Sequence, residues 1–216
     1  RIAKPNQSLA QMKGILKVHK KLPLLIAIPT TAGTGSETTL AAVITDADTH
    51  HKYAINDFNL IPDYAVLEPS VTYGLPPQLT ATTGMDALTH AIEAYIGRST
   101  TKQTRAASIE AIQLIFDNLQ TAYKNGNDKT ARRNMLRASY LAGTAFTKSY
   151  VGYVHAVAHS LGGCYGIPHG LANSVLLPIV LKAYGTAAHK KLARLARITG
   201  ISDSKLDAVA AEEFIN

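Results

Sequence analysis

From about residue 80 onward, apolar residues recur every three or four positions through a series of segments. This spacing puts them on one face of an α-helix and is typical of helices packed around a shared core. Glycines stand where most of the segments stop, as expected at helix ends. The expected helices cover residues 80–96, 102–123, 129–147, 151–161, 171–184, 187–198 and 204–215, with stops at Gly97, Gly126, Gly162–Gly163, Gly185 and Gly200.

The residues before Pro69 have a different character. Short apolar runs bounded by Asp, Pro or Thr predict buried strands at Leu24–Ile28, Leu40–Ile44 and Tyr64–Leu67. We therefore expect the C-terminal part of an α/β domain over residues 1–69 and an all-α helical domain over residues 70–216. Three strands are few for an α/β domain, so we expect its beginning, and the last helices of the second domain, to lie outside this chain.

The composition excludes several classes of protein. The net charge is +7, but the basic residues form scattered pairs such as Arg132–Arg133 and Lys190–Lys191, without interleaved aromatics. This pattern indicates solvated helix faces and no nucleic-acid partner. The longest apolar stretches are interrupted by proline and too short to span a membrane. Cys164 is the single cysteine, which excludes a disulfide framework and favours a reducing, cytoplasmic location.

The segment around residue 86 combines a core face with chemically active side chains. Asp86, His90 and Glu93 fall on one stripe of the expected helix, next to a core face formed by Met85, Leu88, Ile92 and Tyr95. An aspartate and a histidine one turn apart can bind one metal ion. They can also form a helix-stabilising pair on the surface, and the segment by itself favours that simpler interpretation.

A cluster of histidines near residue 160 makes the metal site more favourable than the surface pair. His155 and His159 lie one helical turn apart, and Gly162–Gly163 are predicted to end their helix. Pro168 introduces the next helix, with His169 at or near its start. A helix, a tight turn and a second helix can bring His155 and His169 together. Buried imidazoles need partners, and a metal ion would satisfy several at once, although backbone carbonyls are the alternative.

The four candidate ligands are three nitrogens and one oxygen, from His90, His155, His169 and Asp86. This set suits Zn²⁺ or Fe²⁺ and does not suit Ca²⁺ or Mg²⁺, which prefer oxygen. It is neither the two-His-one-carboxylate triad of oxygenases nor a His-Glu-x-x-His protease helix.

A Thr- and Gly-rich turn, Pro29–Glu37, follows the first predicted strand. Thr34 and Glu37 have the spacing of a capping box, which predicts the start of a helix. Small residues would let a ligand approach the backbone, and threonine hydroxyls can donate to phosphate or ribose. The turn is neither G-x-G-x-x-G nor a Walker loop. Its spacing fits a plain strand-to-helix turn at least as well as a phosphate site.

Taken together, these segments resemble the iron-containing (group III) alcohol dehydrogenase family, which has a dehydroquinate synthase-like architecture. The resemblance rests on residues 28–37, 83–93, 155–163 and 168–173, and extends from about residue 22 to 200. It implies an α/β nucleotide-binding remnant followed by an all-α metal-binding and catalytic domain. The family's metal ligands, for Fe²⁺ or alternatively Zn²⁺, fall on Asp86, His90, His155 and His169. Its proton-transfer histidine falls on His159. Its contacts with NAD or NADP fall on Thr30, Thr31, Gly33, Thr34, Thr39 and Lys52.

The resemblance also implies a reaction, which is hydride transfer between a primary or secondary alcohol, or an aldehyde, and NAD(P), with the metal polarising the substrate oxygen. We expect a small-molecule substrate, a homo-oligomer, and no nucleic-acid or membrane partner. The family's Gly-Gly-Gly-Ser turn for the cofactor pyrophosphate does not occur in this sequence. The alternatives are a zinc-dependent relative such as glycerol dehydrogenase or dehydroquinate synthase, a metallohydrolase, and a truncated, non-catalytic metal-binding fragment.

Overall fold

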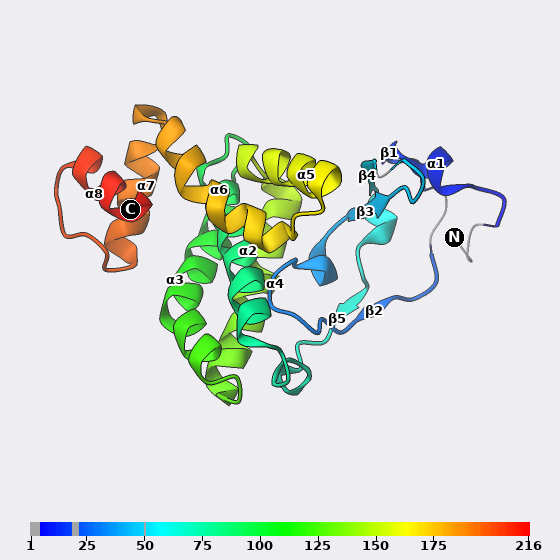
Figure 1. Ribbon diagram of the computed structural model, residues 1–216, viewed down its shortest axis with the longest axis horizontal. Coiled ribbons are helices and arrows are strands. Elements are labelled where there is room, and N and C mark those ends of the chain that lie inside the picture. The colour runs from blue at the N-terminus through cyan, green and yellow to red at the C-terminus, as the bar shows by residue number, and fades with distance from the viewer. Residues whose placement is uncertain (1–4, 19–21, 50) are drawn as a thin grey trace.

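Strands and helices occupy opposite ends of the molecule in the computed structural model, which describes residues 5–18, 22–49 and 51–216 (Figure 1). The strand-containing part comes first in the chain and the large helices follow. This arrangement confirms the prediction of an α/β remnant followed by an all-α part. The division between residues 69 and 70 remains a proposal, and residues 1–4, 19–21 and 50 of the expected first unit lie outside the described residues.

Short strands, 3₁₀ turns and one short helix make up the first part. In chain order they are α1 (Leu9–Met12), β1 (Gly14–Ile15), β2 (Ile26–Ala27), η1 (Ser36–Thr38), β3 (Ala41–Thr45), β4 (Lys52–Asn56), η2 (Phe58–Leu60), β5 (Tyr64–Ala65) and η3 (Pro69–Thr72). Strand β4 pairs with β1 in parallel and with β3 antiparallel, while β2 pairs with β5 in parallel. A small core of Met12, Val18 and Ile55 lies under the three-stranded sheet.

The strand predictions were only partly correct. Residues 41–45 form β3 as expected, but the strand is not buried, since its residues alternate between exposed and half-buried. Residues 64–65 form the short strand β5, in which Tyr64 is exposed, so the prediction that this run is buried is wrong. Strand β4 was missed because its sequence shows no clean apolar run. The run Leu24–Ile28 forms only the two-residue strand β2, and the prediction that it is buried is wrong. Leu24 is 67% exposed and Ile26 is 52% exposed. An apolar run becomes buried only when other layers cover both faces of its sheet, and β2 lies in a sheet of two strands.

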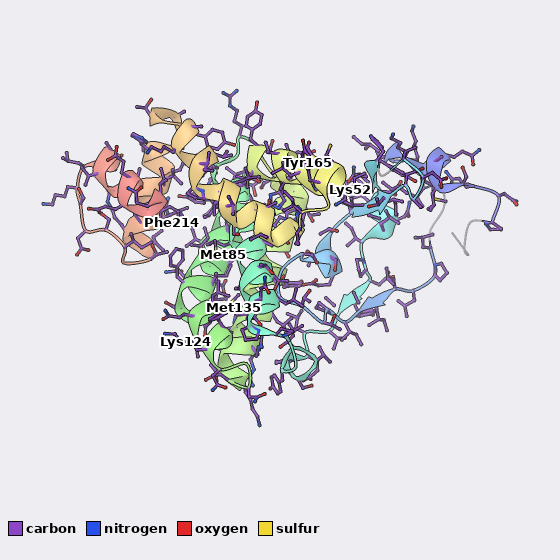
Figure 2. The ribbon with its side chains drawn as sticks, in the orientation of Figure 1. Lys52, Met85, Lys124, Met135, Tyr165 and Phe214 are labelled. Atoms are coloured by element: carbon purple, nitrogen blue, oxygen red, sulfur yellow. The ribbon has the colours of Figure 1, made fainter. Side chains whose placement is uncertain are left out.

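The second part consists of long helices, among which none of those described is both long and apolar enough to cross a membrane. They are α2 (Pro77–Ile96), α3 (Lys102–Lys124), α4 (Lys129–Ser149), α5 (Tyr153–Tyr165), α6 (His169–Ala183), α7 (Thr186–Ile198) and α8 (Asp207–Ile215). Helices α2, α3 and α4 pack around fully buried side chains such as Ile92, Ile112 and Leu136. Met85 and Met135 lie among these helices (Figure 2).

Most of the helices end at or near the glycines that were predicted to end them. Gly97 is the C-cap of α2, and Gly185 and Gly200 lie just beyond α6 and α7. The prediction that Gly162–Gly163 end a helix is wrong, because α5 continues to Tyr165 and ends at Gly166 in the left-handed conformation. A Cβ on Gly162 would lie 2.9 Å from Nζ of Lys52, which is the flexible end of a side chain.

Candidate metal centre

Helix α2 brings two of the proposed ligands and one further acid to the centre of the helical part. Asp86, His90 and Glu93 occupy positions i, i+4 and i+7, so they share one face of the helix. Their exposed fractions are 3%, 6% and 3%. A pair on the surface is therefore excluded for Asp86 and His90.

Helices α5 and α6 supply the remaining histidines. His155 is fully buried on α5, and His169 is the first residue of α6, as the sequence predicted. The start of α6 can approach α2 closely because residue 170 is glycine. A Cβ on Gly170 would lie 2.3 Å from the carbonyl oxygen of Thr82. This contact of α6 with α2 carries His169 toward Asp86.

The donor atoms of three proposed ligands form one group, and His169 lies next to this group through its contact with Asp86. Side-chain donor atoms of Asp86, His90 and His155 all lie within 4.8 Å of one another. Oδ1 of Asp86 lies 3.5 Å from Nε2 of His155 and 3.5 Å from Nε2 of His169. Ligand atoms around a tetrahedral ion with bonds of 2.0–2.1 Å are about 3.4 Å apart, so these spacings fit a Zn²⁺- or Fe²⁺-sized ion.

Two buried polar atoms also support this fit. Nδ1 of His90 and Oδ1 of Asn173 are buried and have no hydrogen-bond partner among the described residues. A buried polar atom without a partner is costly, and such atoms often mark the place of a bound ion or water. Together with the mixed nitrogen and oxygen donors, this makes the four residues chemically suitable for a transition metal.

The ring of His90 is held between two other rings. Its centroid lies 4.2 Å from that of Phe146 on α4 and 4.2 Å from that of His155, and both ring pairs are stacked. The stacking restricts the plane of the imidazole without using its nitrogens. Nothing in the sequence around Phe146 indicated this role, because the contact joins helices far apart in the chain.

Asn173 lies among the proposed ligands and was not predicted as a site residue. Its Nδ2 atom lies 2.6 Å from Oδ1 of Asp86, 3.1 Å from Nε2 of His155 and 3.2 Å from Nε2 of His169. The amide has two hydrogens, so it can donate to only two of these three acceptors at a time. Its position four residues after His169, on the same helix face, was the signal that could have identified it.

Burial and charge set the protonation of this cluster. Burial raises the pKa of Asp86, but its interactions with His90, His155 and His169 lower this pKa by more. The net pKa of Asp86 therefore lies well below its usual value. Burial and the charge of His155 together lower the pKa of His90 to about 3. Burial also lowers the pKa of His169. A neutral imidazole beside an ionised carboxylate is the combination that metal binding requires.

His159 lies beside the cluster, one turn after His155. Its ring stacks on that of His169 with centroids 4.8 Å apart, and it is only partly buried. Burial and the charges of His169, His155 and Lys52 lower its pKa to about 4. Lys52 lies next to the last turn of α5, near Tyr165 (Figure 2).

The Thr-rich turn lies against helices α2 and α4. The predicted capping box and helix are wrong. Gly35 adopts a left-handed conformation, Thr34 accepts a hydrogen bond only from the amide of Ser36, and the single 3₁₀ turn η1 follows. The carboxylate of Glu37 is buried instead, and burial raises its pKa. Of the proposed cofactor contacts in this turn, Thr30 and Thr34 are exposed, Thr31 is half-buried, and Gly33 and Thr39 are buried.

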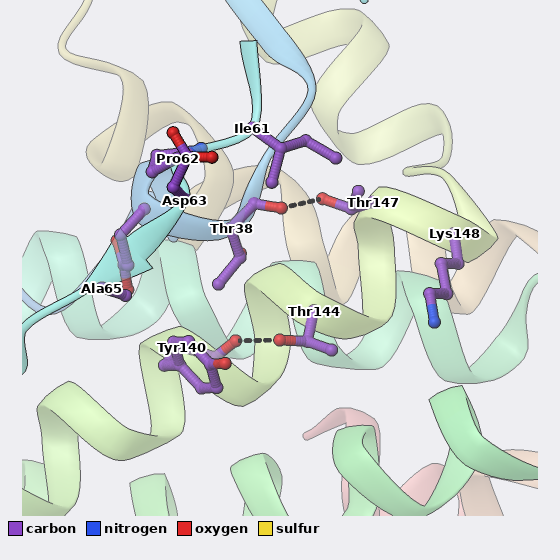
Figure 3. Close-up of a pocket in the computed structure, with 10 residues that line it drawn as sticks. Thr38, Ile61, Pro62, Asp63, Ala65, Tyr140, Thr144, Thr147 and Lys148 are labelled. Atoms are coloured by element: carbon purple, nitrogen blue, oxygen red, sulfur yellow. Dashed lines mark hydrogen bonds between the residues drawn. The ribbon is translucent and has the colours of Figure 1, made fainter. Parts of the chain in front are cut away.

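A separate cavity of about 270 Å³ lies on the turn, between η1, the residues before β5, and helix α4 (Figure 3). The hydroxyl of Thr147 donates to the carbonyl oxygen of Thr38 across it, and that of Thr144 donates to Tyr140. None of the proposed metal ligands lines this cavity. The proposed metal chemistry therefore lies at the histidines and outside this cavity.

The chain matches two family profiles in sequence. Residues 80–216 match the profile described as "Fe-containing alcohol dehydrogenase family, C-terminal", and residues 2–69 match "Iron-containing alcohol dehydrogenase". The chain is 44% identical over 205 residues to 1,3-propanediol dehydrogenase of Klebsiella pneumoniae, covering 95% of this chain and 53% of that protein. It is 50% identical over 174 residues to alcohol dehydrogenase 4 of Schizosaccharomyces pombe, covering 81% and 41%.

Solved structures are similar over nearly the whole chain. A 1,3-propanediol oxidoreductase superposes with a TM-score of 0.94 at 42% identity, covering 99% of this chain and 56% of that one. An alcohol dehydrogenase from Oenococcus oeni superposes with a TM-score of 0.95 at 40% identity, with the same coverage. The chain thus spans about half the length of the relatives it matches.

Proposed function

Because the chain belongs to the iron-containing alcohol dehydrogenase family, we propose that it carries the metal centre of an alcohol dehydrogenase. The observation that supports this best is the convergence of Asp86, His90 and His155 from two helices, with His169 of a third helix 3.5 Å from Asp86. The names of the relatives include alcohol and propanediol dehydrogenases, so the proposed substrate is a small primary or secondary alcohol, or the matching aldehyde.

We assign the metal to Asp86, His90, His155 and His169. A bound ion would supply Lewis-acid stabilisation of the negative charge on the substrate oxygen. Iron is the ion that the family's name gives, and the same donor set accepts zinc. A zinc-dependent, glycerol dehydrogenase-like enzyme is therefore the closest alternative.

We propose that His159 handles the proton of the alcohol. It is the histidine next to the ligand cluster that keeps part of its surface accessible. Because its pKa is lowered, the ring is neutral at pH 7 and can accept a proton, directly or through water or a ribose hydroxyl. The nearby ammonium group of Lys52 helps the ring to release that proton again.

The Thr-rich turn is proposed to contact the nicotinamide end of NAD or NADP, through Thr30, Thr31, Gly33, Thr34 and Thr39, with Lys52 from β4. Its packing supports this role, because a Cβ on Gly33 would lie 2.7 Å from Cβ of Thr83. Thr83 precedes Asp86 by one turn of α2, so the turn lies close to the metal ligands. Hydride transfer needs this proximity of cofactor and substrate oxygen. A homo-oligomer and a cytoplasmic location are also proposals.

Metal analysis tests the assignment. Chain purified anaerobically with iron and zinc supplied should bind one divalent ion, with anomalous density beside Asp86 and the three histidines. His155→Ala should abolish this binding, because it removes a ligand from the buried group. His189→Ala on α7 is the matched control and should bind the ion normally. Density at another place, or no bound metal, would contradict the assignment.

A further inference from the structure

The buried carboxylate of Glu93 contacts His155, one of the proposed metal ligands. Glu93 is only 3% exposed, and its Oε2 atom lies 2.6 Å from Nδ1 of His155. The backbone N–H of Gly152 donates to Oε2 at 2.9 Å, and that of Val154 donates to Oε1 at 2.8 Å. Glu93 thus connects helix α2 to the beginning of helix α5, on the side of His155 that faces away from Asp86.

These contacts determine which ring nitrogen of His155 carries the hydrogen. An ionised carboxylate can only accept hydrogen bonds, so the ring must donate from Nδ1 to Glu93. In the neutral ring, Nε2 then has no hydrogen and presents a lone pair. Nε2 is the atom that lies 3.5 Å from Oδ1 of Asp86. The lone pair therefore points into the proposed metal centre.

Asn173 is compatible with the same tautomer from the opposite side of the ring. The atom of its amide that lies 2.6 Å from the Asp86 carboxylate must be the NH₂ group, because two oxygens would repel each other. The same NH₂ group lies 3.1 Å from Nε2 of His155. A donor at this distance is compatible with Nε2 as an acceptor, which is the role that the contact with Glu93 gives it.

The backbone holds Glu93 in place. Its partners at Gly152 and Val154 are amides at the start of α5, where N–H groups have no partner within the helix. A Cβ on Gly152 would lie 2.6 Å from Oε1, so the backbone approaches as closely as it does because residue 152 is glycine. The orientation of the His155 ring therefore follows from the packing of α2 against the start of α5.

We propose that Glu93 is a positioning residue that keeps His155 in the Nδ1–H tautomer, with Nε2 free to bind the metal. The proposal rests on the proposed function for its metal, while the tautomer itself can be measured without metal. Carboxylates that hydrogen-bond to ligand histidines act in this way in other metal sites, and their loss weakens metal binding by about 10–100-fold.

The tautomer can be tested by NMR. Long-range ¹⁵N–¹H spectra of the metal-free chain at alkaline pH, where histidines are neutral, distinguish Nδ1–H from Nε2–H rings. The signals of His155 are identified by their loss in His155→Gln. We expect Nδ1–H in the wild-type chain. An Nε2–H ring in the wild type would overturn the proposal, whatever any variant does.

Zinc affinity, measured by competition with a chromophoric chelator, gives the second test. Glu93→Gln replaces an oxygen by an NH₂ group of the same size, so the Nδ1–H tautomer is no longer enforced. We expect a fall in affinity of about 10–100-fold. Asp128→Asn is the matched control, because Asp128 caps the start of α4 by accepting from the amide of Ala131 and contacts no ligand. This control should leave zinc affinity unchanged.

The outcomes separate the two proposals. Equal zinc affinity in wild type and Glu93→Gln, with His155 still Nδ1–H in both, would overturn the role of Glu93 and leave the metal centre intact. A wild-type chain that binds no zinc, yet has an Nδ1–H ring at His155, would overturn the proposed function while the tautomer assignment stands. Equal losses in Glu93→Gln and Asp128→Asn would show that Glu93 only caps a helix.

Discussion

The histidines of the cluster differ in their surroundings even though they lie within a few ångströms of one another. His90 is stacked between two rings, and its Nδ1 atom is buried without a partner. Burial lowers the pKa of His155, but the neighbouring carboxylates of Asp86 and Glu93 raise it by more because they stabilise the protonated ring, so the net pKa is raised. His159 keeps part of its surface accessible. On the proposed assignment, these different environments would allow His159 to act on protons while the other rings bind metal.

The division of roles between His155 and His159 can be tested by replacing each with alanine. His159→Ala should retain the bound ion, because His159 is proposed to contact the reacting proton and not the metal. In the active enzyme it should lower turnover by about 10²–10⁴-fold, the usual effect of losing a general acid or base. Metal content by elemental analysis and turnover by NAD(P)H absorbance check both points. Loss of the ion from His159→Ala would mean that His159 is itself a ligand.

Glu37 should make stability depend on pH. Burial raises the pKa of its carboxyl above the value in the unfolded chain, and its oxygens have no partner in any other described residue. Below the unfolded pKa both states are protonated. As the pH rises toward the folded pKa, the unfolded state ionises first, so stability falls. Glu37→Gln should therefore raise the Tm at pH 7 and change it little near pH 4. Thermal unfolding at both pH values measures this.

A Glu37→Gln variant that is less stable than wild type at pH 7 would contradict this expectation. It would indicate that the carboxylate is ionised in the folded chain and has a favourable partner. The exposed Glu68→Gln, which alters the cap of η3, serves as a control for the general effect of removing one negative charge.

Helical spacing is a local property, so the sequence could place several of the proposed ligands on shared helix faces. Asp86 and His90 share a face of α2 by their separation alone, and Pro168 correctly indicated the start of a helix at His169. The partners of these residues were not predictable in the same way. Phe146 reaches the centre only through the packing of helices that are distant in sequence. Asn173 shares a helix face with His169, but its contacts with Asp86 and His155 likewise depend on that packing.

At the level of whole elements, one wrong prediction of a helix end arose from a pair of glycines. Gly162–Gly163 were expected to end a helix, but they lie inside α5, which continues to Tyr165. Glycine permits both a helix stop and a close approach, and only the tertiary neighbours decide between them. The apolar run at β2 shows a similar limit, since burial depends on layers that the run itself does not encode.

Docking of the Thr-rich turn on α4 can be tested at Gly143. A Cβ there would lie 2.2 Å from Oγ1 of Thr38 and 2.9 Å from the carbonyl oxygen of Gly35. Gly143→Ala should therefore move η1 away from α4 and destabilise the chain by about 1–3 kcal/mol, the usual range for overpacking. Denaturant unfolding measures the loss. Gly74→Ala is the matched control, because a Cβ on Gly74 meets nothing within 4 Å. Equal stabilities of the two variants would show that the contact is not tight.

For the whole molecule, we expect metal binding without strong cofactor binding. A dinucleotide is held mainly through its pyrophosphate, on glycine-turn amides at the start of a helix. The sequence contains neither a Gly-Gly-Gly-Ser nor a G-x-G-x-x-G turn, and the Thr-rich turn would contact only the nicotinamide end. Each ~1.4 kcal/mol of lost contact weakens affinity tenfold. The 216-residue chain should therefore bind NAD⁺ and NADP⁺ weakly and oxidise alcohols negligibly.

Calorimetric titration of the zinc-loaded chain with each dinucleotide measures this affinity. Micromolar binding together with measurable turnover would show that these 216 residues suffice for cofactor binding. Titration of metal-free chain is the control for binding that does not involve the metal centre.

All the proposed ligands come from α2, α5 and α6, and none comes from a strand. On the proposed assignment, the ion would therefore be held by helices, without a ligand from the strands. Since an ion that binds only the folded state stabilises that state, metal supply would govern how much of the newly made protein survives. We therefore expect the proposed metal to be bound before the redox cofactor and independently of it.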